Sequence, residues 1–223
     1  GGFPRPFGGE RRASHPETKF FQRVTLTQKE SKTMNESTVI ALGFFDGVHL
    51  GHGALLRRAA EEAALRGCTP AVFTFDRPPK EVVTGVPCPL INSPEDRRDL
   101  VRRLYRIQDV LMVPFDREMM TTPWDDFIVR ILVGRYHAVH LVAGHDHHFG
   151  HRNQGTPELL AQKCAQLGLG CDIIPKVEVA GITVSSPYIR RLVELGQISR
   201  ANRFLGHPHT LTGTVRHGRG IGS

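Results

Sequence analysis

Five short apolar stretches alternate along the chain with longer segments that have helical features. The apolar stretches are rich in β-branched and aromatic residues, as buried strands are, and they cover residues 37–42, 70–75, 109–115, 138–143 and 171–175. Periodic apolar positions and capping residues predict helices over residues 53–66, 93–107, 122–133 and 156–168, a hairpin over 177–184, and helices starting at 185 and 197. Strands that alternate with helices favour an α/β fold with a doubly wound, mostly parallel sheet.

The two ends of the chain do not follow this pattern. Residues 1–36 carry several Gly and Pro and many charges with little apolar periodicity, which indicates a disordered or non-native leader. Residues 37–206 are expected to form one α/β domain. From His209 onward the sequence changes to the alternation of a strand. Residues 207–223 are therefore interpreted as the truncated start of a β-rich second domain, too short to bury its own core.

The helix predicted over 93–107 is strongly basic. Ser93 is a candidate N-cap, and Leu100, Leu104 and Ile107 recur at helical spacing. The helix has arginines at positions 97, 98, 102, 103 and 106. We expect all five arginines to form its solvated face.

The first strand runs directly into Gly43-Phe-Phe-Asp-Gly-Val-His-Leu-Gly-His52 and then into the first helix. Gly43 and Gly47 allow the backbone to approach a ligand closely. The helix start offers free N–H groups and the positive end of the helix dipole, which suit phosphate. His49 and His52 lie three positions apart, so two helical residues here would share one face and point at one group.

Histidine suits phosphate chemistry because its unperturbed pKa of about 6.5 lets a nearby polyphosphate hold it protonated. His49 and His52 could stabilise charge on a phosphorus centre and on departing pyrophosphate. The structural alternative is a pair of helix-start histidines that contact solvent or a neighbouring strand. The position of the motif directly after a strand favours the phosphate site.

A second candidate phosphate site begins at Ser185-Ser-Pro-Tyr-Ile-Arg190. Ser186 is the expected N-cap, and Arg190 lies four residues further on, one turn deeper in the helix. Hydroxyl and amide groups with a planar cation behind them can hold phosphate oxygens. A capped surface helix without a ligand is the alternative.

A glycine-punctuated loop over residues 144–155 contains four histidines. His145 and His147, or His148 and His151, could converge on zinc. No cysteine or distant histidine completes a common ligand set, so no protein-bound metal is predicted.

Asp76 follows the strand over 70–75 at its carboxyl end, where α/β folds bind ligands. The alternative for this residue is an exposed turn former.

The composition is that of an ordinary globular protein, because 39% of the 223 residues are hydrophobic and 23% are charged. No apolar run approaches the roughly 18 residues of a membrane helix, and the N-terminus has no apolar secretion signal. The four cysteines lack metal or disulfide spacing, so we expect reduced thiols in the cytoplasm. The net charge of +7 suits polyphosphate substrates; nucleic acid is not predicted as a partner because no DNA- or RNA-binding motif accompanies the charge.

The sequence from Gly43 to His52 resembles the signature of the HxGH nucleotidylyltransferases. It is similar to the FMN adenylyltransferase module at the N-terminus of the bacterial bifunctional riboflavin kinase/FAD synthetase family. The loop over 144–155 resembles that family's Gly-x-Asp/Asn-x-x-Phe-Gly segment, and residues 185–190 resemble its Ser-Ser-Thr-x-x-Arg motif. The resemblance covers roughly residues 37–223 and implies a Rossmann-like fold.

Three places depart from the family pattern. Phe44 stands where many relatives have Asn, and Pro187 replaces a Thr whose hydroxyl would contact phosphate. Arg77 and Pro78 replace Pro and His in the family's Asp-Pro-His-Pro sequence, from which Asp76 carries over.

The resemblance implies that ATP and FMN react to give FAD and pyrophosphate, without a covalent enzyme intermediate. It implies catalytic roles for His49, His52 and Arg190. The ATP-binding residues would be Gly43, Phe44, Phe45, Asp46, Gly47, His49, His52, Ser185, Ser186 and Arg190. The flavin-binding residues would be Asp76, Asp146, Phe149 and Gly150. Mg²⁺ would accompany ATP through phosphate oxygens, with few protein ligands.

The end of the chain resembles the opening strand of the family's riboflavin kinase domain, so kinase activity is expected only of a longer parent protein. Two other functions stay open, and nucleic-acid binding ranks behind both of them. One is a different HxGH adenylyl- or cytidylyltransferase, and the other is a non-catalytic module that binds flavin or ATP. The sequence carries no signal for the oligomeric state.

Overall fold

The computed structural model describes residues 36–215 of the chain. Within them, five strands form one parallel sheet in the order β3-β2-β1-β4-β5. The strands are β1 Thr38–Leu42, β2 Thr69–Phe75, β3 Asp109–Val113, β4 Ala138–Gly144 and β5 Gly170–Ile174. The prediction of a doubly wound α/β fold is confirmed.

Helices connect these strands and cover the sheet. They are α2 Leu50–Arg66, α3 Pro79–Thr84, α4 Pro94–Tyr105, α5 Arg117–Thr121, α6 Trp124–Asp126, the π-helix η1 Phe127–Val133, the 3-10 turn η2 His151–Asn153, α7 Pro157–Leu167, α8 Ser186–Glu194 and α9 Ile198–Leu205. The predicted hairpin forms as β6 Glu178–Val179 and β7 Ile182–Thr183. Helix α3 was not predicted, because the two prolines at its start, Pro78 and Pro79, favoured a loop.

Strand β1 lies at the centre of the sheet, and all five of its residues are buried. It pairs with β2 on one side and with β4 on the other. From β1 the chain moves outward to β2 and β3, and then returns to the far side of β1 to form β4. The carboxyl ends of β1 and β4 therefore flank the point where strand order reverses, which is where open α/β sheets bind ligands.

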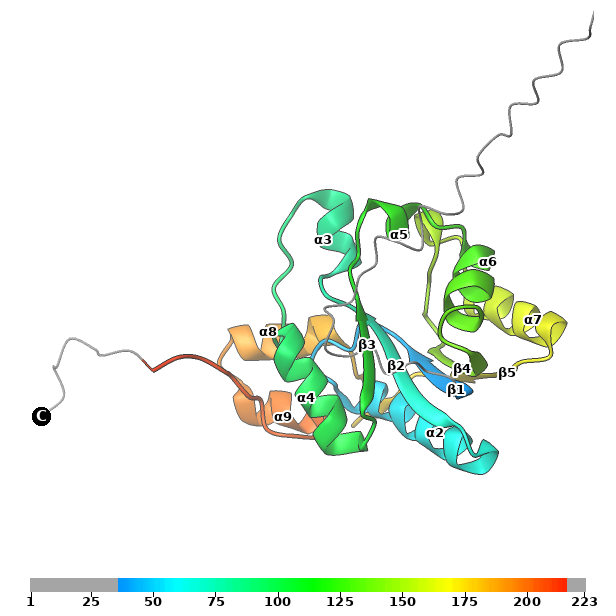
Figure 1. Cartoon of the computed structure of the whole chain (residues 1–223). Coiled ribbons are helices and arrows are strands. Elements are labelled where there is room, and N and C mark those ends of the chain that lie inside the picture. Colours follow the sequence, from blue (N-terminus) through cyan, green and yellow to red (C-terminus); the bar gives the residue numbers. More distant parts are fainter. Residues whose placement is uncertain (1–35, 216–223) are drawn as a thin grey trace, which may run out of the picture. The chain divides into compact units, whose positions relative to one another are not determined.

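The two faces of the sheet carry separate apolar cores, because successive residues of a strand point to opposite faces. Val39 and Ala41 belong to the core beneath α2 and α4. Ile40 and Leu42 belong to the core that includes η1 and α7. Figure 1 shows α2 and α4 on one side of the sheet and α6 and α7 on the other.

A third apolar cluster joins the end of the described chain to the rest of the domain. Helices α8 and α9 contribute Ile189, Phe204 and Leu205, and these pack with Ile91 and Val184. The cluster holds the second candidate motif, at the start of α8, in a fixed position.

One arginine of the basic helix does not lie in solvent. Residues 103 and 106 are exposed, but Arg97 is only 1% exposed. The prediction of a fully solvated arginine face is wrong at this position, because Arg97 finds main-chain oxygen partners at the end of the sheet.

The strand expected after His209 does not form within residues 209–215, which are the part of that segment that the structure describes. Residues 207–215 form neither helix nor strand, because no neighbouring strand pairs with them there and a ladder needs a partner. Residues 216–223, like the predicted leader over 1–35, lie outside the described residues. The domain boundaries at 37 and 206 stay predictions.

Across residues 36–215, no helix combines the length and the apolar character needed to cross a bilayer.

Candidate active site

A cavity of about 520 Å³ lies at the carboxyl ends of the central strands. Gly43 and Phe44 line it directly after β1, and Gly144 lines it at the end of β4. Ser185 and Ser186 line it from the start of α8. The cavity therefore brings both candidate phosphate motifs together at the switch point of the sheet.

His49 and His52 form a stacked pair in the cavity wall. Their ring centroids lie 3.6 Å apart with an interplanar angle of 11°. His49 is the N-cap of α2, and its Nδ1 accepts the main-chain N–H of His52 at 3.2 Å. His49 has the extended backbone of an N-cap and is not helical, and its ring stacks on that of the helical His52. In the neutral ring the acceptor role of Nδ1 leaves the proton of His49 on Nε2.

Burial lowers the pKa of His49 to about 4. Burial, together with the neighbouring His49 and Arg97, holds the pKa of His52 well below its ordinary value of 6.5. Both rings are therefore neutral at pH 7. The buried Nδ1 of His52 has no hydrogen-bond partner there. A polyphosphate in the cavity would favour the charged imidazolium form.

The turn between β1 and α2 is conformationally strained. Phe45 has φ 58° and Val48 has φ 43°, although non-glycine residues, and β-branched ones above all, avoid this region. Both side chains are fully buried, so packing holds the turn in place. Gly47 has φ 83°, and a Cβ there would lie 2.8 Å from Ile91. Residues 45–47 lie behind the cavity lining and shape the turn that carries the histidines.

Asp46 connects the first motif to the second. Its buried carboxylate accepts the amides of Ile91 at 2.8 Å and Asn92 at 3.3 Å. Its main-chain oxygen accepts the hydroxyl of Ser186 at 2.9 Å, and its Oδ2 lies 3.5 Å from Nε of Arg190. Burial raises the pKa of Asp46, and these amides and Arg190 oppose the rise.

The second motif differs from its prediction in detail. Ser185, and not Ser186, is the N-cap of α8. Ser186 is the first helical residue, and its hydroxyl turns back to Asp46. Arg190 pairs with Asp46 and is not among the residues that line the cavity. Its predicted catalytic role stays a prediction.

The loop over 144–155 forms one side of the cavity, and Asp146, Phe149 and Gly150 all line it. Phe149 and Gly155 exchange main-chain hydrogen bonds of 3.1 and 2.8 Å, which close the loop. Gly150 has φ 72°, and a Cβ there would lie 2.5 Å from Cα of Trp124. The flavin-binding role predicted for these residues stays a prediction.

Of the four histidines in this loop, His147 lies deepest. Its ring stacks on Phe149 with centroids 5.5 Å apart, and burial lowers its pKa to about 4. The loop histidines belong to no group of three metal-ligand side chains in the described residues.

Asp76 does not line the cavity. It is partly buried, and its Oδ1 accepts the main-chain amide of Phe115 at 3.0 Å. Asp76 therefore joins the loops that follow β2 and β3, and its predicted contact with flavin stays a prediction.

Sequence reasoning missed the apolar wall of the cavity. It consists of Phe73, Phe75, Pro79, Phe115, Met119 and Phe127. Phe75 and Phe115 meet edge to face with centroids 4.8 Å apart. Aromatic residues just before or after the ends of β2 and β3 were the available signal. Lys176, which also lines the cavity, carried no motif.

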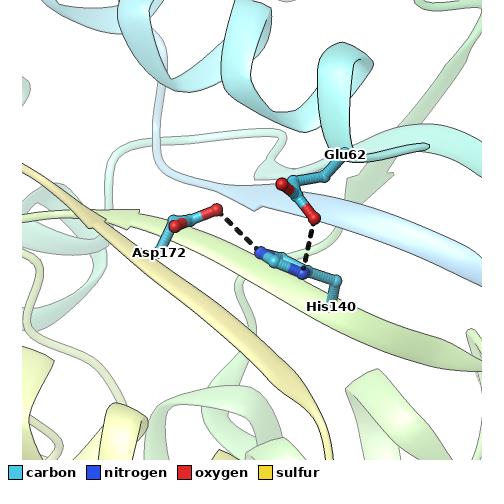
Figure 2. A group of neighbouring side chains, drawn as sticks. All are labelled: Glu62, His140 and Asp172. Carbon is cyan, nitrogen blue, oxygen red and sulfur yellow. Dashed lines mark hydrogen bonds and ion pairs between the residues drawn. The ribbon is translucent and has the colours of Figure 1, made fainter. Parts of the chain in front are cut away.

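A second polar cluster lies between α2, β4 and β5, and its residues do not line the cavity. Glu62, His140 and Asp172 place one possible metal-ligand atom each within 4.8 Å of one another. Nε2 of His140 lies 2.9 Å from Asp172, and Nδ1 lies 3.4 Å from Glu62 (Figure 2). Two carboxylates and an imidazole are a donor set that divalent transition metals accept.

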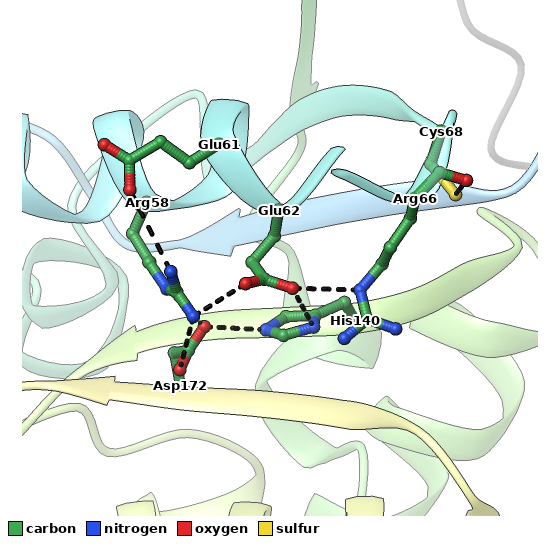
Figure 3. Close-up of polar contacts among 7 residues, drawn as sticks. All are labelled: Arg58, Glu61, Glu62, Arg66, Cys68, His140 and Asp172. Carbon is green, nitrogen blue, oxygen red and sulfur yellow. Dashed lines mark hydrogen bonds and ion pairs between the residues drawn. The ribbon is translucent and has the colours of Figure 1, made fainter. Parts of the chain in front are cut away.

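Two arginines already neutralise this cluster. Arg58 lies 2.6 Å from Glu62 and 2.7 Å from Asp172, and Arg66 lies 3.0 Å from Glu62 (Figure 3). Burial raises the pKa of Asp172, but the hydrogen bonds from Arg58 and His140 outweigh it and lower the pKa overall. A metal ion would have to displace both guanidinium groups, so the cluster is better described as an ion-pair network that fastens α2 to the sheet.

Comparison with protein families agrees with the motif residues. The model of the FAD synthetase family matches residues 31–188, which include the stacked histidines, the loop over 144–155 and the start of α8. The chain belongs to the FAD synthetase family. The family resemblance predicted from the motifs is therefore confirmed.

Curated relatives of this FAD synthetase family chain are bifunctional riboflavin kinase/FMN adenylyltransferases. The protein of Listeria monocytogenes is 35% identical over 195 residues, covering 86% of this chain and 60% of its own length. The protein of Bacillus subtilis is 32% identical, covering 84% of this chain and 59% of its own length. The chain thus spans about three fifths of the length of these relatives.

Among solved structures, a crystal structure described as a macrolide-efflux protein from Streptococcus pneumoniae has the same fold. Its TM-score is 0.70 with 26% sequence identity, and the match covers 78% of this chain and 57% of that one. This member of the FAD synthetase family therefore shares its Rossmann-like architecture with a protein whose structure is described under another function.

Proposed function

We propose that the chain is an FMN adenylyltransferase, which transfers AMP from ATP to FMN and releases pyrophosphate. The observation that carries the proposal is the stacked His49–His52 pair in the wall of a cavity whose remaining lining is partly aromatic. The curated relatives that the chain matches are named for this activity. Riboflavin kinase activity, also in their names, is not part of the proposal.

The two kinds of lining suit the two halves of FMN. The isoalloxazine ring is flat and largely apolar, so edge-to-face aromatics such as Phe75 and Phe115 can hold it. The phosphate of FMN and the phosphates of ATP require donors and positive charge. Within the same cavity Lys176 supplies positive charge, and the hydroxyl of Ser185 and the main-chain amide of Ser186 supply donors. His49 and His52 supply ring N–H groups.

In the proposed reaction, an oxygen of the FMN phosphate attacks the α-phosphorus of ATP. The bond from that phosphorus to the bridging oxygen breaks, and its electron pair leaves with pyrophosphate. His49 and His52 would become charged as the polyphosphate binds and would stabilise the transferring group and leaving group. No side chain needs to form a covalent bond.

Arg190 would contribute by leaving Asp46 and turning toward the ATP phosphates. Its side chain is 30% exposed, and its Nε has no hydrogen-bond partner of good geometry in the ligand-free protein. The pairing with Asp46 is therefore weak enough to exchange for phosphate.

Mg²⁺ fits this cavity as a companion of ATP. Asp146 is the one carboxylate among the lining residues, and magnesium commonly binds through one or two carboxylates together with substrate phosphates. When bound, the ion would neutralise phosphate charge. The free cysteines are consistent with the proposed site of action in the cytoplasm.

The test is FAD formation by the purified chain from FMN, ATP and Mg²⁺, followed by chromatography. FAD from FMN, with nothing formed from riboflavin, is the expected result. Flavin binding without FAD would favour a non-catalytic module. Absence of both would turn attention to other phosphate substrates of HxGH transferases, including those that use CTP.

A further inference from the structure

Arg97 is a buried cation behind the cavity wall. It is 1% exposed and lies in the first turns of α4, where a positive charge opposes the helix dipole. Burial lowers its pKa to about 10, partly offset by the charges of Asp46, Asp76 and Glu95, so it remains charged at neutral pH. A charge that is buried at an unfavourable place on a helix needs specific hydrogen-bond partners from other parts of the structure.

The partners of Arg97 are two main-chain oxygens at the ends of neighbouring strands. Its Nη1 donates to the main-chain oxygen of Phe44 at 2.6 Å, and its Nη2 donates to that of Phe75 at 2.7 Å. Phe44 follows β1, and Phe75 is the last residue of the adjacent strand β2. The fork of one guanidinium therefore fixes the spacing between two neighbouring strand ends.

The same guanidinium also packs on a ring that lines the cavity. The central carbon of Arg97 lies 4.3 Å from the ring centroid of Phe44, which is a cation–π contact. Phe44 and Phe75 both line the cavity, and Phe44 stands directly before the strained turn that leads to the histidines. Arg97 thus contacts the backbone that carries the aromatic wall and the backbone that leads into the candidate phosphate motif.

We propose that Arg97 is a positioning residue for the FMN adenylyltransferase reaction, which sets the distance between the flavin-facing aromatic wall and the histidine turn. The inference rests on the proposed function. Arg97 makes no contact with substrate in this role. It keeps the Phe44 and Phe75 rings, and through them the flavin, in line with the phosphate site, where an error of about 1 Å can cost on the order of a hundredfold in rate.

The test compares four variants under the FMN, ATP and Mg²⁺ assay. Arg97→Met removes the fork but keeps apolar bulk, and Arg97→Lys keeps the charge but not the two parallel donors. Leu100→Ala, at a buried position on the same helix, is the control for lost stability. Arg103→Met, at an exposed position of that helix, is the control for lost charge.

We expect Arg97→Met to lower kcat/KM for FMN by about tenfold or more, with a larger rise in KM for FMN than for ATP. Arg97→Lys should fall between it and the unsubstituted protein. Leu100→Ala and Arg103→Met should keep kcat/KM within about twofold at a temperature where each is folded. Titration of FMN fluorescence should show the same order of affinities.

A fall in Arg97→Met no larger than that of Leu100→Ala would overturn the proposal. If Arg97→Met does not fold, an unchanged kcat/KM and KM for FMN in Arg97→Lys would overturn it as well. These outcomes differ from failure of the proposed function, in which the unsubstituted protein itself makes no FAD. In that case equal FMN affinity across the four variants and the unsubstituted protein would still count against Arg97.

Discussion

The hydroxyl of Ser186 donates a hydrogen bond of 2.9 Å to the main-chain oxygen of Asp46, a residue 140 positions earlier in the chain. This bond ties the start of α8 to the turn that carries the two histidines. Because the turn is strained at Phe45 and Val48, contacts of this kind hold it in one conformation before any ligand binds. The two phosphate motifs therefore behave as one unit.

Ser186→Ala should weaken this unit. Loss of the hydrogen bond is expected to lower the free energy of unfolding by about 1 kcal/mol and to raise KM for ATP several-fold. Ser185→Ala is the matched control, because its side chain makes no capping bond and should leave the unfolding free energy unchanged. Chemical denaturation and steady-state kinetics measure the two effects. Equal unfolding free energies for both variants would contradict the structural role of Ser186.

His52→Ala should lower kcat by about a hundredfold or more, because it removes a group expected to stabilise the charge of the transition state. The accompanying loss of stability should be small, since the buried Nδ1 of His52 has no hydrogen-bond partner to lose. His137→Ala, at an exposed position before β4, should keep full activity. Thermal unfolding measured beside turnover separates the two effects, and a parallel loss of both would indicate a structural histidine.

Stability should fall as the pH drops from about 6.5 to about 4. The pKa values of His49 and His147 are each lowered to about 4 in the folded protein, so the unfolded chain takes up more protons in this range. Each histidine then costs on the order of 2 kcal/mol between pH 7 and pH 5. Denaturant titrations at the two pH values measure the slope. His147→Asn should flatten it, and an unaltered slope would show that His147 is not neutral when folded.

The Glu62–His140–Asp172 network should stabilise the fold without a metal. His140→Ala is expected to lower the free energy of unfolding by about 2 kcal/mol, because Asp172 loses a hydrogen bond and the buried ring leaves a cavity between α2 and the sheet. Treatment with EDTA, or addition of Zn²⁺ or Mn²⁺, should leave the melting temperature unchanged. A rise in melting temperature with either metal that disappears in His140→Ala would show that a metal ion can displace Arg58 and Arg66.

Much of the fold follows from local sequence signals. The five strands lie within two residues of their predicted bounds, Ser93 is the N-cap as predicted, and the helices predicted to end at 66 and 168 end at Arg66 and Leu167. Caps and periodicity act within a few residues, so the sequence carries them directly. His49 and His52 could be singled out from the sequence because the strand, the turn and the helix start that position them are contiguous along the chain. Local signals failed at Ser186, where the cap position shifted by one residue and the hydroxyl took a distant partner instead.

By itself, the sequence determined the alternating α/β architecture, the positions of the two candidate phosphate motifs and the family. Only the tertiary structure decided that Arg97 is buried, that Phe75 and Phe115 form a wall, and that Arg190 rests on Asp46. These outcomes depend on groups brought together from different strand ends. A charge pattern along one helix shows which residues can be solvated. It cannot show that the tertiary fold places two carbonyl oxygens from neighbouring strands within hydrogen-bond distance of one arginine. Burial of Arg97 is favourable only because both partners are in place.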